Sequence, residues 1–320
     1  MKLIGAFFRL IRWPNLVFIV ITQVLFYYCI VLPIFKSPAD VDLNKISTFL
    51  FWLIVASSVT IAAAGYIIND YFDLNIDQVN KPDAIVIQKL IKRRWAIVWH
   101  LLLSAIGVII AFYVGFKIGN ILLGFANLAC VLLLLTYSTT FKKKLLIGNV
   151  IISVLTAWVV LVLYFGEVRV MYWNWSPEFK ILYQTKITRL FKFATIYAGF
   201  AFIISLIREV VKDMEDMEGD EKYGCKTMPI VWGIPASKVF VAVWLIVLTF
   251  STGIVQVYGL MKGWWLGAVY CFIFIVLPLL YLFKHLYRAV NAKDYHKVST
   301  YIKLTMLTGI LSILFFKLYM

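Results

Sequence analysis

The feature that most constrains this chain is a succession of apolar runs, each long enough to cross a lipid bilayer. A spanning helix needs about 20 apolar residues, and 63% of the 320 residues are hydrophobic whereas only 15% are charged. The expected spans are 13–35, 46–69, 95–116, 118–137, 146–166, 192–208, 237–259, 264–283 and 301–318. The sequence therefore predicts an all-α, polytopic membrane protein of nine transmembrane helices that forms a single domain over residues 1–320.

The distribution of positive charge orients the chain in the membrane. The formal net charge is +15, but the Lys and Arg residues are spread over the connections between apolar runs. Because they form no continuous basic stripe, we do not expect nucleic acid as a partner. Cytoplasmic loops carry an excess of Lys and Arg, and 21 of the 31 lie on one side when the N-terminus is placed inside. We therefore expect a cytoplasmic N-terminus.

Two acidic triplets with the same spacing follow the second and the sixth apolar runs. They are Asp70, Asp73 and Asp77, and Asp213, Asp216 and Asp220. At 3.6 residues per turn, this spacing places each triplet on one helix face. An even number of crossings separates the triplets, so both lie on the cytoplasmic side. Carboxylates ~6 Å apart at an effective dielectric constant of ~20 repel by about 3 kcal/mol per pair, which favours a bound cation over plain solvated loop charge.

The residue types around the triplets select among cations. No His or Cys accompanies either triplet, which argues against zinc and softer metals. Gln78 and Ala84 stand where an EF-hand requires Gly and Glu, which argues against a calcium sensor. Mg²⁺ takes one or two carboxylates and completes its shell with water and substrate phosphates. The triplets therefore predict Mg²⁺ and a diphosphate.

Isolated histidines offer no competing site. His100, His285 and His296 have no acidic partner at a useful sequence spacing, and we assign them no catalytic role. Arg208 and Lys212, by contrast, stand among the acids of the second triplet, where they suit phosphate binding.

The two motifs resemble those of a known family. NDYFDLNIDQVNKP is similar to the NDxxDxxxD signature of the UbiA-type intramembrane prenyltransferases, and REVVKDMEDMEGDEKYGCKTMPIVWG to their second, DxxxD-bearing loop. The second loop is most similar to the branch that contains the archaeal digeranylgeranylglyceryl phosphate synthases. The likeness extends to Arg12-Trp13-Pro14-Asn15, Thr136-Tyr137-Ser138 and Gly148-Asn149, and it covers nearly the whole chain.

This resemblance implies a fold and an activity. The fold is nine helices around a central cavity that cytoplasmic loops cap, in a multi-pass protein of a prokaryotic plasma membrane with its active-site loops in the cytoplasm. The activity is Mg²⁺-dependent transfer of a polyprenyl group, geranylgeranyl in this branch, from its diphosphate. The acceptor is soluble in the membrane and is a prenyl glycerol phosphate in this branch. We expect membrane lipids as further partners.

The resemblance also implies roles for individual residues. Two Mg²⁺ ions would be held by Asp70, Asp73, Asp77, Asp213, Asp216 and Asp220. The implied substrate-binding residues are Asn15, Asn69, Lys81, Tyr137, Lys142, Arg208 and Lys212. The implied catalytic residues are Asp213, Lys142 and Arg208: the two cations would neutralise the leaving diphosphate, and the carboxylate would accept the proton of the acceptor.

Two alternatives stay open at this point. An aromatic acceptor, as in quinone or haem biosynthesis, would use the same donor. The segment after Asp77 lacks the Arg-Pro-rich stretch that family members often have there. The resemblance therefore indicates the identity of the acceptor less firmly than that of the donor. An ion or anion transporter would place ionisable residues deep within several spans, whereas the acids here collect on one side.

Overall fold

The computed structural model of the protein describes residues 2–35, 45–169 and 176–319. Within these ranges nine helical segments are long and apolar enough to cross a membrane, which confirms the predicted all-α membrane architecture. Their bounds are Trp13–Phe35, Thr48–Asn80, Arg93–Lys117, Leu122–Thr139, Ile147–Glu167, Pro177–Glu215, Gly233–Met261, Trp265–Arg288 and Ala292–Leu318.

The chain divides into two compact units. The first comprises Met1–Thr139 and Trp158–Ala198, and the second Thr140–Ala157 and Gly199–Met320. The first unit contains α1 (Lys2–Leu10), α2 (Trp13–Phe26), η1 (Tyr27–Val31), α3 (Leu32–Phe35), α4 (Thr48–Asn80), η2 (Pro82–Ala84), α5 (Arg93–Lys117) and α6 (Leu122–Thr139). Two helices, α7 (Ile147–Glu167) and α8 (Pro177–Glu215), contribute a half to each unit.

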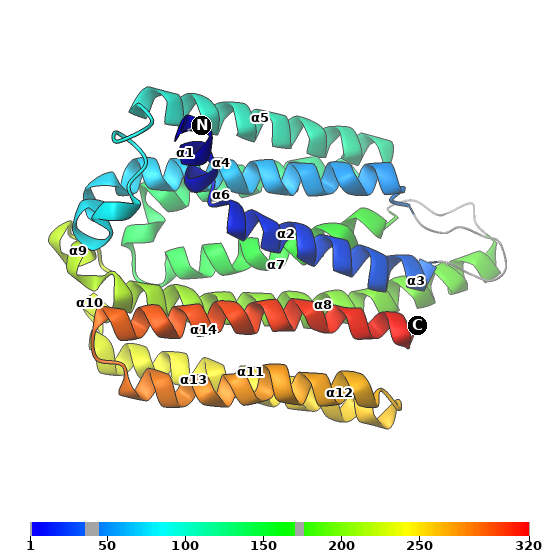
Figure 1. Ribbon diagram of the computed structural model, residues 1–320. Coiled ribbons are helices and arrows are strands. Elements are labelled where there is room, and N and C mark those ends of the chain that lie inside the picture. Colours follow the sequence, from blue (N-terminus) through cyan, green and yellow to red (C-terminus); the bar gives the residue numbers. More distant parts are fainter. Residues whose placement is uncertain (1, 36–44, 170–175, 320) are drawn as a thin grey trace. The chain divides into compact units, whose positions relative to one another are not determined.

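In the first unit, α4 is the central helix. It packs along α5 and α6, and α2 also contacts it; Figure 1 shows α4 and α5 side by side. The approach to α5 is close at Gly107, where an added Cβ would lie 2.6 Å from Ile61. Ser57 donates a hydrogen bond of 2.8 Å to the Gly107 carbonyl at the same place. Small residues and interhelical hydrogen bonds are what hold helices together in a membrane, where lipid is as apolar as the side chains.

A buried carboxylate joins three segments of the first unit. Glu167, at the end of α7, is 0% exposed. Its carboxylate accepts hydrogen bonds from the backbone N–H groups of Lys45 (2.8 Å) and Ile46 (3.1 Å), directly before α4. Its carbonyl accepts one from the hydroxyl of Tyr183 on α8. The end of α7 is therefore tied to the start of α4 and to the first half of α8.

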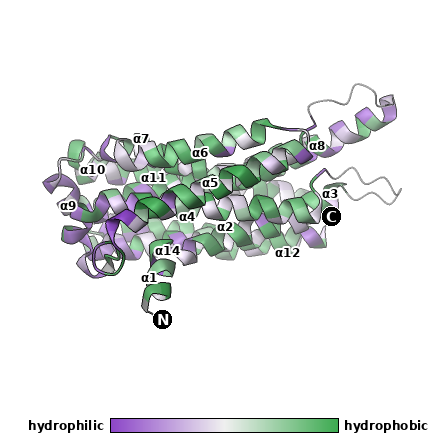
Figure 2. Ribbon diagram, turned by 90° about the horizontal axis from the view of Figure 1, so that it is seen from above, coloured by the Kyte–Doolittle hydropathy of each residue, from purple (hydrophilic) through white to green (hydrophobic). Residues whose placement is uncertain are grey.

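The second unit is built from long apolar helices at its centre. It contains η3 (Phe141–Lys143), α9 (Met217–Lys222), α10 (Met228–Val231), α11 (Gly233–Met261), α12 (Trp265–Cys271), η4 (Phe272–Val276), α13 (Leu277–Arg288), α14 (Ala292–Leu311) and η5 (Ser312–Leu318). Its core is formed by buried residues such as Ile207 on α8, Leu245 on α11, Leu279 on α13 and Ile302 on α14. In Figure 2, α9 is coloured as hydrophilic, whereas the long helices are mostly hydrophobic.

Two spans contain π-helical turns, and a proline explains each. The turns are Tyr27–Val31 and Phe272–Val276, and Pro33 and Pro278 follow two residues later. Proline removes a backbone N–H and its ring clashes with the preceding turn. A locally widened turn relieves that clash without ending the helix.

The sixth span is longer than the sequence predicted. The apolar run covers 192–208, but α8 extends over Pro177–Glu215. The part of α8 before residue 192 carries a buried apolar stripe, which packs against the rest of the protein. It is formed by Tyr183, Ile187 and Leu190, at spacings of four and three. This amphipathic stripe, rather than a continuous apolar run, continues the helix into the segment that the hydropathy pattern assigned to a connection.

Candidate functional site

The first acidic motif lies on α4 itself. The predicted span ended at residue 69, but the helix continues without a break to Asn80 because Leu74 and Ile76 remain buried. Asp70, Asp73 and Asp77 therefore share the face that their spacing predicted, on a helix rather than in a loop. Lys81 follows as the cap of this helix, because Pro82 disfavours the helical conformation of the residue preceding it.

Arg12 is an ion-pair partner of the first motif. Its guanidinium lies 2.6 Å from the Oδ1 atom of Asp70 and its Cζ lies 5.4 Å from the ring centroid of Tyr66. Burial disfavours the charged form of Arg12, but the charge and hydrogen bond of Asp70 together with Tyr66 and Asp73 outweigh it and raise the pKa of Arg12 above its ordinary value. Arg12 occupies the left-handed region (φ 50°) between α1 and α2, a conformation uncommon for a residue with a side chain. It was among the residues that carry the family resemblance, but no role was predicted for it.

Asn69 provides a second contact at this motif. Its Nδ2 donates a hydrogen bond of 2.7 Å to Oδ2 of Asp73, whose exposure is 4%. The Oδ1 atom of Asn69 is buried and accepts no hydrogen bond from the described residues. Buried acceptors nearly always have a partner, and an amide oxygen beside carboxylates is a ligand type that hard divalent cations accept. This donor set fits Mg²⁺.

The second motif departs from the prediction of one helix face. Asp213 lies on α8, which ends at Glu215, whereas Asp216 stands in the bend that follows and Asp220 lies on α9. The break comes where the apolar packing of α8 ends, after buried Met214. Gly224, with a φ of +71°, closes α9 and allows the N–H of Cys225 to donate to the Asp220 carbonyl. The spacing alone gave no sign of this break.

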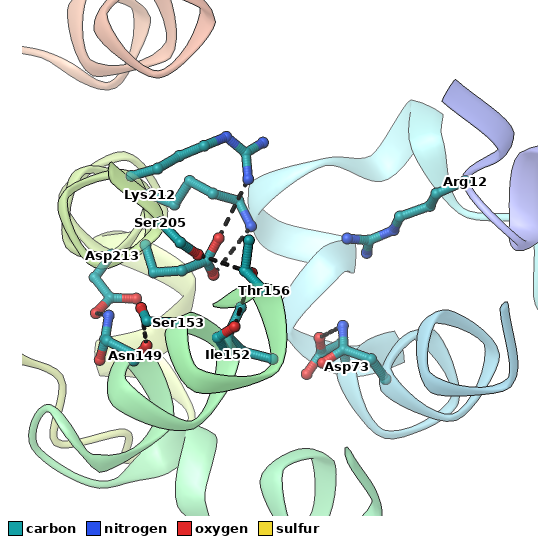
Figure 3. A network of polar contacts seen from close by, with 12 residues as sticks. Arg12, Asp73, Asn149, Ile152, Ser153, Thr156, Ser205, Lys212 and Asp213 are labelled. Carbon is teal, nitrogen blue, oxygen red and sulfur yellow. Dashed lines mark hydrogen bonds and ion pairs between the residues drawn. The ribbon is translucent and has the colours of Figure 1, made fainter. Parts of the chain in front are cut away.

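Asn149 fixes the carboxylate of Asp213. Its Nδ2 donates a hydrogen bond of 2.7 Å to Oδ2 of Asp213, and Figure 3 shows the two side chains turned toward each other. Asn149 is 8% exposed and lies on the first turn of α7. A contact between the hydroxyls of Thr156 and Ser205 (3.2 Å) joins α7 to α8 further along. Asn149 is thus a positioning residue that the sequence pattern did not assign.

A partly buried glutamate, Glu209, lies among the cations next to the second motif. Glu209 lies 3.2 Å from Arg208 and its other oxygen lies 3.5 Å from Lys212. Lys142, on η3, also acts electrostatically on Glu209. Arg208, Lys212 and Lys142 were predicted to bind substrate. In the structure all three act on the carboxylate of Glu209, a residue for which the sequence predicted no role.

The remaining predicted residues stand at helix ends. Asn15 lies on the first turn of α2, Lys81 caps the end of α4, and Tyr137 lies near the end of α6; all three are half-buried. Their roles toward substrate remain predictions.

One histidine differs from its prediction. His296 was predicted to have no acidic partner, but its Nδ1 lies 2.9 Å from Oε1 of Glu215. The two residues are 81 positions apart, so the pairing is invisible to local spacing.

No group of three or more His, Cys, Asp or Glu side chains in the described part of the chain converges as a ready metal cage. Mg²⁺ does not require one, because water and substrate phosphates usually supply most of its ligands. The arrangement at each motif is one or two carboxylates with amide partners. Such a set suits an ion that arrives with a phosphorylated substrate.

Comparisons with known proteins agree with these motifs. The model of the UbiA prenyltransferase family matches residues 24–307. A digeranylgeranylglyceryl phosphate synthase of Methanothermobacter thermautotrophicus is 33% identical over 67% of this chain and 68% of its own length. One from Methanosphaera stadtmanae is 26% identical over 83% of this chain and 88% of its own.

Solved structures show the same fold. A structure described as a digeranylgeranylglyceryl phosphate synthase covers 98% of this chain and 99% of its own, with a TM-score of 0.60 and 22% identity. A UbiA homolog from Archaeoglobus fulgidus bound to DMAPP and Mg²⁺ covers 96% of this chain and 98% of its own, with a TM-score of 0.57 and 17% identity. The chain is an integral membrane prenyltransferase and belongs to the UbiA prenyltransferase family.

Proposed function

We propose that this enzyme transfers a geranylgeranyl group from geranylgeranyl diphosphate to a prenylated glycerol phosphate in the membrane. The observation that carries the proposal is the match of the chain to digeranylgeranylglyceryl phosphate synthases over two thirds or more of their length. The name of those enzymes gives their product, digeranylgeranylglyceryl phosphate, and its formation from a geranylgeranyl donor calls for a geranylgeranylglyceryl phosphate acceptor. The cations around Glu209 are compatible with an acceptor that carries a phosphate.

The donor diphosphate is assigned to the two acidic motifs. We propose that their six aspartates hold two Mg²⁺ ions, and that Asn69 and Asn149 orient Asp73 and Asp213 for this task. Bound Mg²⁺ neutralises negative charge on a leaving phosphate group. A related UbiA homolog has been solved with DMAPP and Mg²⁺, which supports this assignment.

The protein groups account for the other steps. Lys212 and Lys142 counter the charge that develops on the leaving diphosphate, because preorganised cations stabilise a transition state without rearranging. The allylic carbon then accepts the electron pair of the acceptor hydroxyl, whose proton passes to a carboxylate, for which we propose Asp213. The apolar spans keep water from the reacting carbon.

The membrane orientation is part of the proposal. We propose a prokaryotic plasma membrane with the N-terminus and both motifs in the cytoplasm. The excess of Lys and Arg on that side supports it. A cysteine introduced at exposed Gln78 should then be labelled by a thiol reagent only when the cytoplasmic face is accessible.

The function is tested by presenting alternative acceptors to the purified enzyme. With geranylgeranyl diphosphate and Mg²⁺, kcat/KM should be highest for geranylgeranylglyceryl phosphate. Geranylgeranylglycerol without its phosphate and 4-hydroxybenzoate serve as competing acceptors. A higher kcat/KM for the aromatic acid would refute the proposed acceptor and leave prenyl transfer intact.

Metal removal should abolish transfer. Chelation by EDTA is expected to reduce product formation to background, because the leaving diphosphate would depart with its full charge. Excess Mg²⁺ should restore the rate, whereas excess Na⁺ at equal ionic strength should not. Undiminished transfer in EDTA would contradict the assignment of the aspartates to metal.

Asn149→Ala should raise the Mg²⁺ concentration needed for half-maximal activity. The substitution removes the donor that holds Asp213, and loss of such an orienting partner typically costs 10- to 100-fold in metal affinity. Asn127→Ala, which removes a buried amide that donates to the Leu123 carbonyl on its own helix, is the matched control. Equal Mg²⁺ dependence in both variants would show that Asn149 has a structural role only.

A further inference from the structure

The second unit contains a lysine that neither acidic motif explains. Lys303 lies eleven residues into α14, about 16 Å along the helix, within a segment that qualifies as a membrane span. It is half-buried. A Lys within a span is costly and is usually functional.

The pairing of α8 with α14 brings Lys303 toward Arg208. The two helices run in opposite directions (Figure 1) and share one apolar core, with Ile207 and Ile302 among its members. The contact between Glu215 and His296 fixes their register. Arg208 is seven residues before Glu215 and Lys303 is seven after His296, so both lie two helical turns from that contact.

Arg208 and Lys303 are in fact close enough to act on each other electrostatically. Arg208, Lys212 and Lys142 act on the carboxylate of Glu209, and Lys303 is a fourth cation that acts on Arg208. The Nε atom of Arg208 is buried and donates to no acceptor in the described part of the chain. A guanidinium with a spare donor that lies beside other cations suits phosphate oxygens.

We propose that Arg208 and Lys303 form a subsite for a phosphate monoester, and that in this enzyme it binds the phosphate of the acceptor lipid. The inference rests on the proposed function and names one part of that site. Arg208 lies five residues before Asp213, about 7.5 Å along α8, so the subsite is displaced along this helix from the carboxylate of Asp213. A monoester needs cations but no metal ion of its own. Glu209 holds Arg208 and Lys212 in place when the subsite is empty.

The subsite is tested with Lys303→Met, which keeps an unbranched side chain of similar length and suits an apolar span. Purified enzyme in nanodiscs is assayed with geranylgeranyl diphosphate and two acceptors, geranylgeranylglyceryl phosphate and geranylgeranylglycerol. The variant should raise the KM for the phosphorylated acceptor by about 10- to 100-fold, the effect of one lost charged hydrogen bond. KM for the donor and turnover of the unphosphorylated acceptor should stay within about twofold of wild type.

Two further variants serve as controls for Lys303→Met. Lys303→Arg keeps the charge and should restore most of the affinity for the acceptor. Lys297→Met, on an exposed position of the same helix, should have no effect on either KM. Circular dichroism of each variant confirms that it is folded.

The outcomes are distinct. An increase in the KM for the donor instead would assign the subsite to the diphosphate and overturn the proposal, as would an equal loss with both acceptors. If wild type fails to use geranylgeranylglyceryl phosphate at all, the proposed function fails. Binding of inorganic phosphate, measured as protection of the apo enzyme against heat in wild type but not in Lys303→Met, then tests the subsite by itself.

Discussion

Replacing Asp73 by Asn should lower kcat for prenyl transfer by about 10²- to 10³-fold, the loss seen when one preorganised electrostatic group is removed from an active site. Asp73 is buried, and its carboxylate accepts a hydrogen bond from Asn69. The amide keeps the size of the side chain but removes the charge that we propose for Mg²⁺. The measurement is steady-state kcat at saturating donor and acceptor over a range of Mg²⁺ concentrations.

Asp83→Asn is the control for this experiment. Asp83 is exposed and lies ten residues further on, outside the triplet. Its replacement should leave kcat within about twofold of wild type. If Asp73→Asn retained half of the wild-type kcat, the first motif would not act in the chemistry.

Glu167→Ala should lower the free energy of unfolding by about 2–6 kcal/mol. The substitution leaves the backbone N–H groups of Lys45 and Ile46 without their acceptor, and each unsatisfied buried group costs about 1–3 kcal/mol. The Lys45 side chain does not replace this acceptor, because its ammonium group can only donate and its Nζ already donates to the Val168 carbonyl (2.9 Å). Unfolding in mixed micelles, followed by circular dichroism, gives the value.

Glu178→Ala removes an exposed glutamate from the first turn of α8 and serves as the comparison. It should change the free energy of unfolding by less than about 0.5 kcal/mol. Glu167→Ala protein that remains folded should keep the wild-type kcat, because Glu167 belongs to neither acidic motif. Equal stability of the two variants would show that the bonds to Lys45 and Ile46 contribute nothing.

Hydropathy predicted the membrane fold well because the signal is local. A span needs only a run of apolar residues, and all nine runs became helices in the described ranges. The beginning of α8 escaped the prediction because its helix depends on a stripe formed by Tyr183, Ile187 and Leu190, not on a continuous apolar run. Such a stripe is visible only when a 3.6-residue period is sought in a segment that also carries many charges.

The acidic motifs can be recognised in the sequence, but the contacts that their carboxylates make cannot. Repeated Asp spacing is a property of the sequence, whereas Arg12 with Asp70 and Asn149 with Asp213 are contacts across 58 and 64 positions. The break between Asp213 and Asp216 was also hidden, because it arises where the apolar packing of α8 ends. Long-range contacts decide which nitrogen meets which carboxylate, and no local pattern encodes them.

The most direct test of the central claim is to count both products of one reaction. Purified enzyme in liposomes receives geranylgeranyl diphosphate, geranylgeranylglyceryl phosphate and Mg²⁺, and released diphosphate and extracted lipid are quantified together, the lipid by mass spectrometry. Prenyl transfer predicts one digeranylgeranylglyceryl phosphate for each diphosphate released, and neither product in EDTA. Release of diphosphate with geranylgeranyl alcohol as the only prenyl product, or no release at all, would contradict the account.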